Sequence, residues 1–437
     1  MEEVSSTVTR STPVSKPRIG ALDGIRALCA IGVVLAHVGW MGRLVGAGPD
    51  APINPVAGFF VAGLEGVILG PFFVLSGMFL YRPFARAALL GTPLPKLGQF
   101  WLRRGARLIP AYWLVAAVSL LFLNFSSIHS AWYVLRPIVL MQSYDFEWIA
   151  GMDPLWTVPT EAQFYLVLPA IAWVMSRLAK TSTDPIKQIR RMQIPLWTLM
   201  LAGLSWTIYL HRPSMGPFPA QYWWPFWGLG LFGLGMMFTL WHVRAEIVPD
   251  RQPLVHRLAR GGPNWFWLGA LGIYLVNCSK PWGKAGYGDW ETIPAGISQY
   301  VLSLVFAFVI VAPLAVPRAT SRFQHALLGN PVAVYLGRIS YGIYLWHFAV
   351  MYFYFKSGSI FGAPPLPAPF LRGQIGFFEL VTAVLIGSIA IATVSWFALE
   401  RPLLKLVGET KLKASPAPVA AATERPAPAA EEPGKAA

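Results

Sequence analysis

Residues 21–41 read ALDGIRALCAIGVVLAHVGWM, an apolar run long enough to cross a bilayer as one helix. A helix needs about 20 residues to cross the hydrocarbon core, because it rises about 1.5 Å per residue. This run nevertheless carries three ionisable side chains, Asp23, Arg26 and His37. Since such groups cost free energy in hydrocarbon, we interpret them as candidates for a functional site within a membrane helix.

The whole chain has the same apolar character. Of its 437 residues, 55% are hydrophobic and 13% are Asp, Glu, Lys or Arg. Soluble domains average about 25% of these charged residues, and one water-exposed core could not bury so much apolar surface. We therefore predict an all-α integral membrane protein. The two cysteines, Cys29 and Cys278, exclude a disulfide framework and a zinc site built from cysteines.

Apolar runs of similar length predict about ten transmembrane helices. They cover residues 21–41, 66–82, 107–124, 155–178, 194–210, 222–241, 264–279, 297–316, 332–355 and 376–398. A shorter stretch at 132–143 is predicted to be an interfacial or re-entrant helix. The chain is expected to divide into a polar cytoplasmic tail (1–20), a membrane domain (21–402) and a disordered Ala- and Pro-rich cytoplasmic tail (403–437). The first run is expected to be retained as an anchor, because it lacks a cleavage site.

Lys and Arg are distributed unequally between the segments that separate these runs. One alternate set of segments, which includes both tails, carries 26 basic residues, and the other set carries 7. Since loops rich in Lys and Arg stay in the cytoplasm, we predict that both termini are cytoplasmic. This topology accounts for the net charge of +15, and no basic stripe indicates a nucleic-acid partner.

Arg26 and His37 are predicted to share one face of the first helix. They are eleven residues apart, which at about 100° per residue is close to three full turns. Asp23 lies one turn before Arg26 and can pair with it. Glu161, near the start of the run at 155–178, is expected at the same depth as His37. It is therefore a candidate to orient His37 as a general base.

Plainer interpretations of these residues remain open. Arg26 could extend to the inner membrane interface and His37 could mark the outer one. Glu161 could stabilise the start of its helix. His347, in the run at 332–355, fits a buried hydrogen-bonded residue as well as a site residue. Ser76 fits close helix packing.

Basic residues cluster before the third run, where residues 101–110 read WLRRGARLIP. Arg104 and Arg107 are one turn apart, and the guanidinium fork matches phosphate oxygens. With Arg103, they predict a cytoplasmic site for a phosphate-bearing ligand. The alternative is that they only anchor the helix end on the cytoplasmic side.

Six segments, taken in chain order, together resemble acyltransferase family 3, whose members are integral membrane O-acyltransferases. The segments are LDGIR (22–26) with His37, FFVLSG (72–77), LRRGARLIPAYW (102–113), WTVPTEAQFY (156–165), ISYGIYLWH (339–347) and ERP (400–402). The resemblance extends from residue 22 to residue 402. It is to the form without an extracellular hydrolase-like domain.

This resemblance implies transfer of an acyl group, commonly acetyl, from cytoplasmic acyl-CoA to a hydroxyl of an envelope glycan or glycolipid. It implies that His37 is the catalytic histidine, that Arg26 is its partner, and that Arg104 and Arg107 serve the donor. The expected location is the plasma membrane of a bacterium, with acetyl-CoA as donor substrate, no bound cofactor and no metal. Substrate-binding or supporting roles are expected for Asp23, Ser76, Trp156, Gln163, Tyr165 and His347.

Two other classes of protein fit parts of the sequence. A glycolipid or polysaccharide transporter would use the buried charges as a translocation path, but the chain shows no internal repeat of the kind that builds many transporters. A membrane scaffold would not explain why His37 and Arg26 are kept at a cost in insertion free energy.

Overall fold

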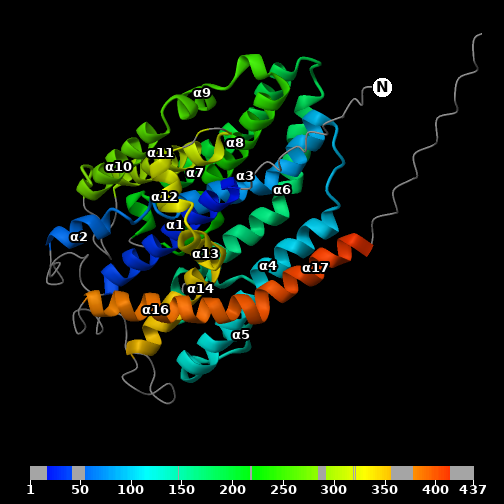
Figure 1. Ribbon diagram of the computed structural model, residues 1–437. Helices are drawn as coiled ribbons and strands as arrows, with labels where there is room; N and C mark the ends of the chain where they lie inside the picture. The colour runs from blue at the N-terminus through cyan, green and yellow to red at the C-terminus, as the bar shows by residue number, and fades with distance from the viewer. Residues whose placement is uncertain are drawn as a thin grey trace, which may run out of the picture.

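A computed structural model describes residues 17–41, 55–145, 147–216, 219–283, 292–317, 319, 321–355 and 377–413. Within these ranges every regular element is a helix and no strand occurs. The helices run roughly side by side in one bundle (Figure 1). The protein is therefore an all-α integral membrane protein, as the composition predicted.

Seven helices of the described ranges are long and apolar enough to cross a membrane. They are α1 (Pro17–Met41), α3 (Gly70–Leu90), α4 (Leu97–Val118), α6 (Thr157–Ala179), α8 (Leu229–Ile247), α11 (Ile293–Ala315) and α16 (Phe377–Ser395). The remaining predicted runs form α7 (Pro185–Leu210), α10 (Pro263–Ser279) and the pair α13 (Pro331–Arg338) and α14 (Ser340–Phe355). Ten spans and cytoplasmic termini stay predictions.

Several helices begin where the sequence supplies a cap. Asp184, Thr292 and Asn330 each accept a backbone N–H from the first turn of α7, α11 and α13, and a proline follows within two residues. A capping side chain satisfies an otherwise unpaired N–H, and proline fits the first turn because it has no N–H to lose. These signals place the starts of α11 and α13 within a few residues of the predicted runs, whereas α7 begins nine residues before the run at 194–210.

The ninth predicted run is divided into two helices. α13 ends at Arg338 and α14 begins at Ser340, whose hydroxyl donates to the carbonyl of Gly337. Gly337 lies so close to the backbone of Asp23 that a Cβ there would collide with it. α13 thus packs directly on the start of α1, and α14 begins after the one-residue break at Ile339.

Two further elements can be compared with the prediction. A short helix was predicted at 132–143, and the structure has one there, α5 (Ala131–Ile138), which begins at the capping residue Ser130 and ends earlier than predicted. α17 (Arg401–Lys413) continues beyond residue 402, into the segment that we expected to be disordered. Residues 1–16 and 414–437 of the two predicted tails lie outside the described residues. Shorter helices are α2 (Pro55–Ala62), α9 (Leu254–Gly261) and α12 (Arg322–Leu328).

The polar residues of α1 face the inside of the bundle because α1 is surrounded by other helices. It contacts α3, α11, α13, α14 and α16, and Figure 1 shows it among them. α3 in turn packs closely on α8, where Gly77 meets the backbone of Phe232 and Gly235 meets that of Val74. Small residues permit this approach between membrane helices. The contact fixes α3 beside α1 and α6, which carry the candidate site.

Candidate functional site

Two histidines meet where α1 packs on α14. Nδ1 of His37 lies 2.9 Å from Nε2 of His347, and the two rings stack with centroids 5.1 Å apart. Nδ1 of His347 lies 2.6 Å from the carbonyl oxygen of Tyr344, one turn earlier on the same helix. His347 is fully buried. The edge of this pair is covered by Phe348, which contacts both rings.

These distances assign the proton positions for a pair of neutral rings. A carbonyl oxygen can only accept, so Nδ1 of His347 carries the proton and its Nε2 is an acceptor. The hydrogen bond between the rings must then be donated by Nδ1 of His37. Nε2 of His37 keeps its lone pair, which is the form that a general base requires.

Glu161 lies on α6 and is held by two hydroxyl groups. Ser76 of α3 donates to Oε1 at 2.7 Å, and Tyr165, one turn further along α6, donates to the same oxygen. In the part of the chain that the structure describes, Glu161 has no hydrogen bond to His37. The expected orientation of His37 by Glu161 is therefore replaced by the contact with His347. The depth that we predicted for both side chains does not specify a contact between them.

Arg26 connects this carboxylate with the start of α1. It interacts electrostatically with Asp23, Glu161 and Arg107. Three helices, α1, α4 and α6, thus contribute charges to one cluster. The predicted pairing of Asp23 with Arg26 fits this arrangement, because Asp23 also interacts electrostatically with Arg26 and Arg107.

The basic residues expected before the third span lie within a helix. α4 begins at Leu97, so Arg103, Arg104 and Arg107 belong to its first three turns. Arg104 interacts electrostatically with Glu161 and with the neighbouring arginines. Among the described residues, the buried Nε atoms of Arg26 and Arg104 have no hydrogen-bond partner. A buried donor without a partner costs about 1–3 kcal/mol, so a ligand with anionic oxygens suits this cluster.

Trp156 and Gln163 make their ring contacts and hydrogen bonds with other residues than the two histidines. The ring of Trp156 packs near Trp223, with centroids 5.3 Å apart. Gln163 accepts a hydrogen bond of 2.8 Å from the hydroxyl of Tyr144. Neither residue has a contact with His37 in the described ranges. Their expected substrate-binding roles stay predictions.

Tyr344 is a site residue that the sequence analysis did not single out. Its hydroxyl donates to the carbonyl of Pro154 and lies 2.7 Å from Oγ1 of Thr157. It thereby ties α14, which carries His347, to the start of α6, which carries Glu161. The available signal was its position one turn before His347 in ISYGIYLWH. Within the described residues, no group of three or more His, Cys, Asp or Glu is arranged to hold a metal ion.

The fold and the site define an all-helical membrane protein with a pair of histidines between α1 and α14, and with a cluster of arginines and carboxylates on α1, α4 and α6. The chain belongs to acyltransferase family 3, because the acyltransferase domain of that family matches residues 19–399. This confirms the family indicated by the six sequence segments.

Similar proteins are known from Staphylococcus aureus. A protein of strain COL that is provisionally named an O-acetyltransferase is 24% identical over 365 residues, which cover 78% of this chain and 52% of that protein. The O-acetyltransferase OatA of strain NCTC 8325 is 24% identical over 399 residues, which cover 88% of this chain and 57% of OatA. The chain thus spans about half the length of the curated relatives it matches. No solved structure matches the chain.

Proposed function

We propose that this protein is a membrane O-acyltransferase that moves an acyl group, expected to be acetyl, from cytoplasmic acyl-CoA to a hydroxyl of an envelope glycan or glycolipid. The observation that carries the proposal is the His37–His347 pair, which leaves a lone pair on Nε2 of His37 inside the bundle. Family membership and the names of the relatives support acyl transfer to oxygen.

In the proposed reaction, Nε2 of His37 takes the proton of the acceptor hydroxyl as the oxygen attacks the carbonyl carbon of the thioester. The C–S bond then breaks, and the departing CoA thiolate receives the proton from His37. His347 holds the ring of His37 in place, because its Nε2 accepts the hydrogen bond from Nδ1–H of His37 throughout the reaction. Its role resembles that of the orienting residue in a hydrolase triad, although it is uncharged.

The donor is expected to bind at the cytoplasmic end of α4. Arg103, Arg104 and Arg107 suit the phosphates of CoA, and the unpaired Nε of Arg104 supports this assignment. Arg26 interacts electrostatically with both Arg107 and Glu161 in the same cluster. The acyl group reaches His37 either on the extended pantetheine arm of CoA or through a covalent intermediate.

The test is acyl transfer by the purified protein in nanodiscs, with radiolabelled acetyl-CoA and envelope glycans or glycolipids as acceptors. His37→Ala is expected to lower the rate by about 10²-fold or more, because a positioned base contributes about 10²–10⁴-fold. His325→Ala, at an exposed position on α12, is the matched control and is expected to keep full activity.

Normal transfer by His37→Ala would remove the catalytic assignment. Wild-type protein that moves a labelled glycolipid across the bilayer, but transfers no acyl group to any acceptor, would favour the transporter instead.

A further inference from the structure

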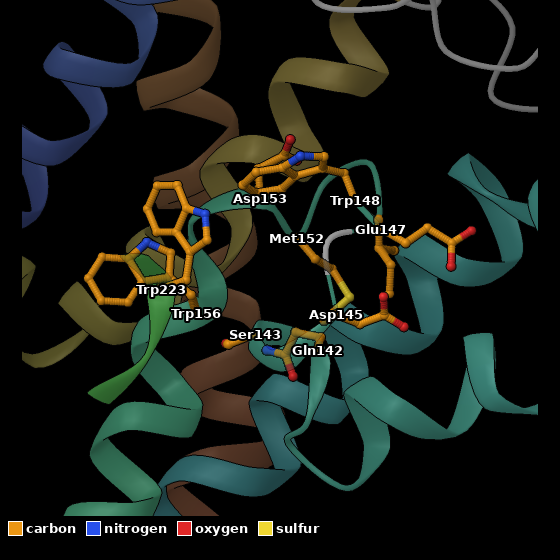
Figure 2. Close-up of a pocket in the computed structure, with 10 residues that line it drawn as sticks. Gln142, Ser143, Asp145, Glu147, Trp148, Met152, Asp153, Trp156 and Trp223 are labelled. Atoms are coloured by element: carbon orange, nitrogen blue, oxygen red, sulfur yellow. The ribbon is translucent and has the colours of Figure 1, made fainter. Parts of the chain in front are cut away.

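A pocket separate from the histidine pair opens between the segment after α5 and the start of α6. The empty space along its walls, including the part that is open to solvent, is about 410 Å³. By the predicted topology it lies on the extracytoplasmic side, opposite the arginines of α4. Figure 2 shows its residues, with two tryptophans on one side and acidic side chains on the other.

The first wall of the pocket is aromatic. Trp223 packs near both Trp156 and Trp148, with ring centroids 5.3 Å and 5.6 Å apart. Figure 2 shows Trp156 and Trp223 together on this side. Aromatic faces are electron-rich and attract the C–H groups on the face of a sugar ring, as they attract the edges of other rings.

The opposite wall is acidic and is held in place by a buried cation. Arg136 of α5 has no exposed side-chain surface and lies 3.1 Å from both Oδ2 of Asp145 and Oε2 of Glu147. Figure 2 shows these two residues across the pocket from Trp156 and Trp223, with Met152 between. A carboxylate that is fixed in this way keeps lone pairs that can accept from hydroxyl groups.

Two polar atoms at the pocket lack a partner. In the part of the chain that the structure describes, neither Oγ of Ser143 nor Nε1 of Trp223 makes a hydrogen bond, although both atoms are buried. Ser143 is only 6% exposed and lines the pocket. Since buried polar groups are normally satisfied, these atoms indicate a ligand that both donates and accepts hydrogen bonds. Sugar hydroxyls do both.

The pocket adjoins the helix that carries His347. Asp153, which lines it, has its Oδ1 3.4 Å from the hydroxyl of Tyr352, and Pro154 accepts the hydrogen bond from Tyr344. Tyr344 and Tyr352 lie on α14 about one turn before and after His347. The pocket is thereby joined through Tyr344, whose ring lies 5.7 Å from that of His347, to the part of α14 that carries the histidine.

We propose that this pocket binds a pyranose ring of the acceptor, and that it selects a neutral or amino sugar over a uronic acid or a phosphorylated sugar. Of the described residues that line it, three are acidic and none is basic. Arg136, which pairs with two of these carboxylates, offsets only one negative charge, so an anionic ring would be repelled. The inference rests on the proposed function, because it names the acceptor class for the same site.

The test measures sugar binding by the full-length protein in nanodiscs without acyl-CoA. The probes are three trisaccharides of similar size: triacetylchitotriose, maltotriose and trigalacturonate, titrated by calorimetry. At least one neutral trisaccharide is expected to bind, and trigalacturonate is expected to bind at least about tenfold more weakly.

Two variants test the walls of the pocket. Trp223→Ala is expected to weaken binding about 3- to 10-fold, and Trp223→Phe should restore most of it because a ring remains. Ser143→Ala should weaken binding about 2- to 10-fold without lowering the thermal stability of the empty protein, since its hydroxyl has no partner there. Trp132→Ala is the control, because Trp132 is 51% exposed on α5 and does not line the pocket.

Wild-type affinity in Trp223→Ala, absence of binding for all three sugars, or preference for trigalacturonate would each overturn the inference. Binding that depends on Trp223, in a protein that transfers no acyl group, would uphold the pocket and remove the proposed function. If Trp223→Ala transfers acyl groups with an unchanged KM for the acceptor, the proposed function stands and the pocket is not the acceptor site.

Discussion

The histidine pair shows how one hydrogen bond decides which nitrogen of a ring can act as a base. Tyr344 holds the proton on Nδ1 of His347, and His347 holds the proton on Nδ1 of His37. No charged residue is needed for this assignment. His347 is thus a positioning residue in the proposed reaction, and its effect must pass through His37.

His347→Ala is expected to lower kcat by about 10²-fold while leaving both KM values within about twofold, because the loss falls on a proton transfer. His347→Gln is expected to recover part of the rate, since an amide oxygen can accept from His37 as Nε2 of His347 does. Steady-state kinetics on protein of equal thermal stability is the measurement. Equal rates for the Ala and Gln variants would show that His347 only fills space.

At the scale of the helix, α4 joins the donor side to the site, because Arg104 and Arg107 project from consecutive turns near its start. A lysine retains the charge at either position but loses the planar fork that matches two phosphate oxygens. The effect of such a change should depend on whether the donor carries phosphates.

The double variant Arg104→Lys and Arg107→Lys is expected to raise the KM for acetyl-CoA about tenfold. With acetyl-pantetheine, which carries the same thioester but no phosphate, the variant and the wild type should have similar KM values. Arg190→Lys, at an exposed position on α7, is the control. An equal loss with both donors would mean that the arginines act on the fold rather than on phosphate.

The contact between α3 and α8 leads to a stability prediction. A Cβ at Gly77 would collide with the backbone of Phe232, which cannot move aside as a flexible side chain could. Gly77→Ala is therefore expected to destabilise the protein by about 1–3 kcal/mol. Gly269→Ala on α10, where a Cβ meets nothing within 4 Å, is expected to have no such effect. Thermal unfolding in detergent measures both.

The sequence predicted the positions of the helices along the chain better than the contacts between them. Apolar runs located the helices to within a few residues at most ends, because both the run and the helix must cover the same hydrocarbon thickness. The break at Ile339 lies beside the close contact of Gly337 with Asp23, which joins segments far apart in the chain, and the continuous apolar run did not predict it. His37 and His347 are 310 residues apart, and depth in the membrane does not specify which helix faces which. The partner of His37 was therefore missed, although His347 itself was a candidate.

For the whole molecule, the ion pairs fit the predicted alternation of sides. Arg86 pairs with Glu246 at the ends of α3 and α8 that are predicted to be cytoplasmic. Lys280 lies 3.4 Å from Glu65, and both belong to segments predicted to be outside. Each pair joins segments assigned to the same side, as hydrated ends of neighbouring spans require.

Labelling of single cysteines with a membrane-impermeant maleimide in intact cells tests this topology. Cys29 and Cys278 are first replaced, and cysteines are then introduced at exposed positions. Ser126→Cys and Ser214→Cys are expected to react from outside, and Lys96→Cys and Thr183→Cys only after the membrane is opened. Lys96 immediately precedes α4, so its side is also the side of Arg104 and Arg107. Labelling of Lys96→Cys in intact cells would place these arginines outside, where cytoplasmic acyl-CoA cannot reach them. Both the predicted topology and the assignment of the donor site would then be wrong.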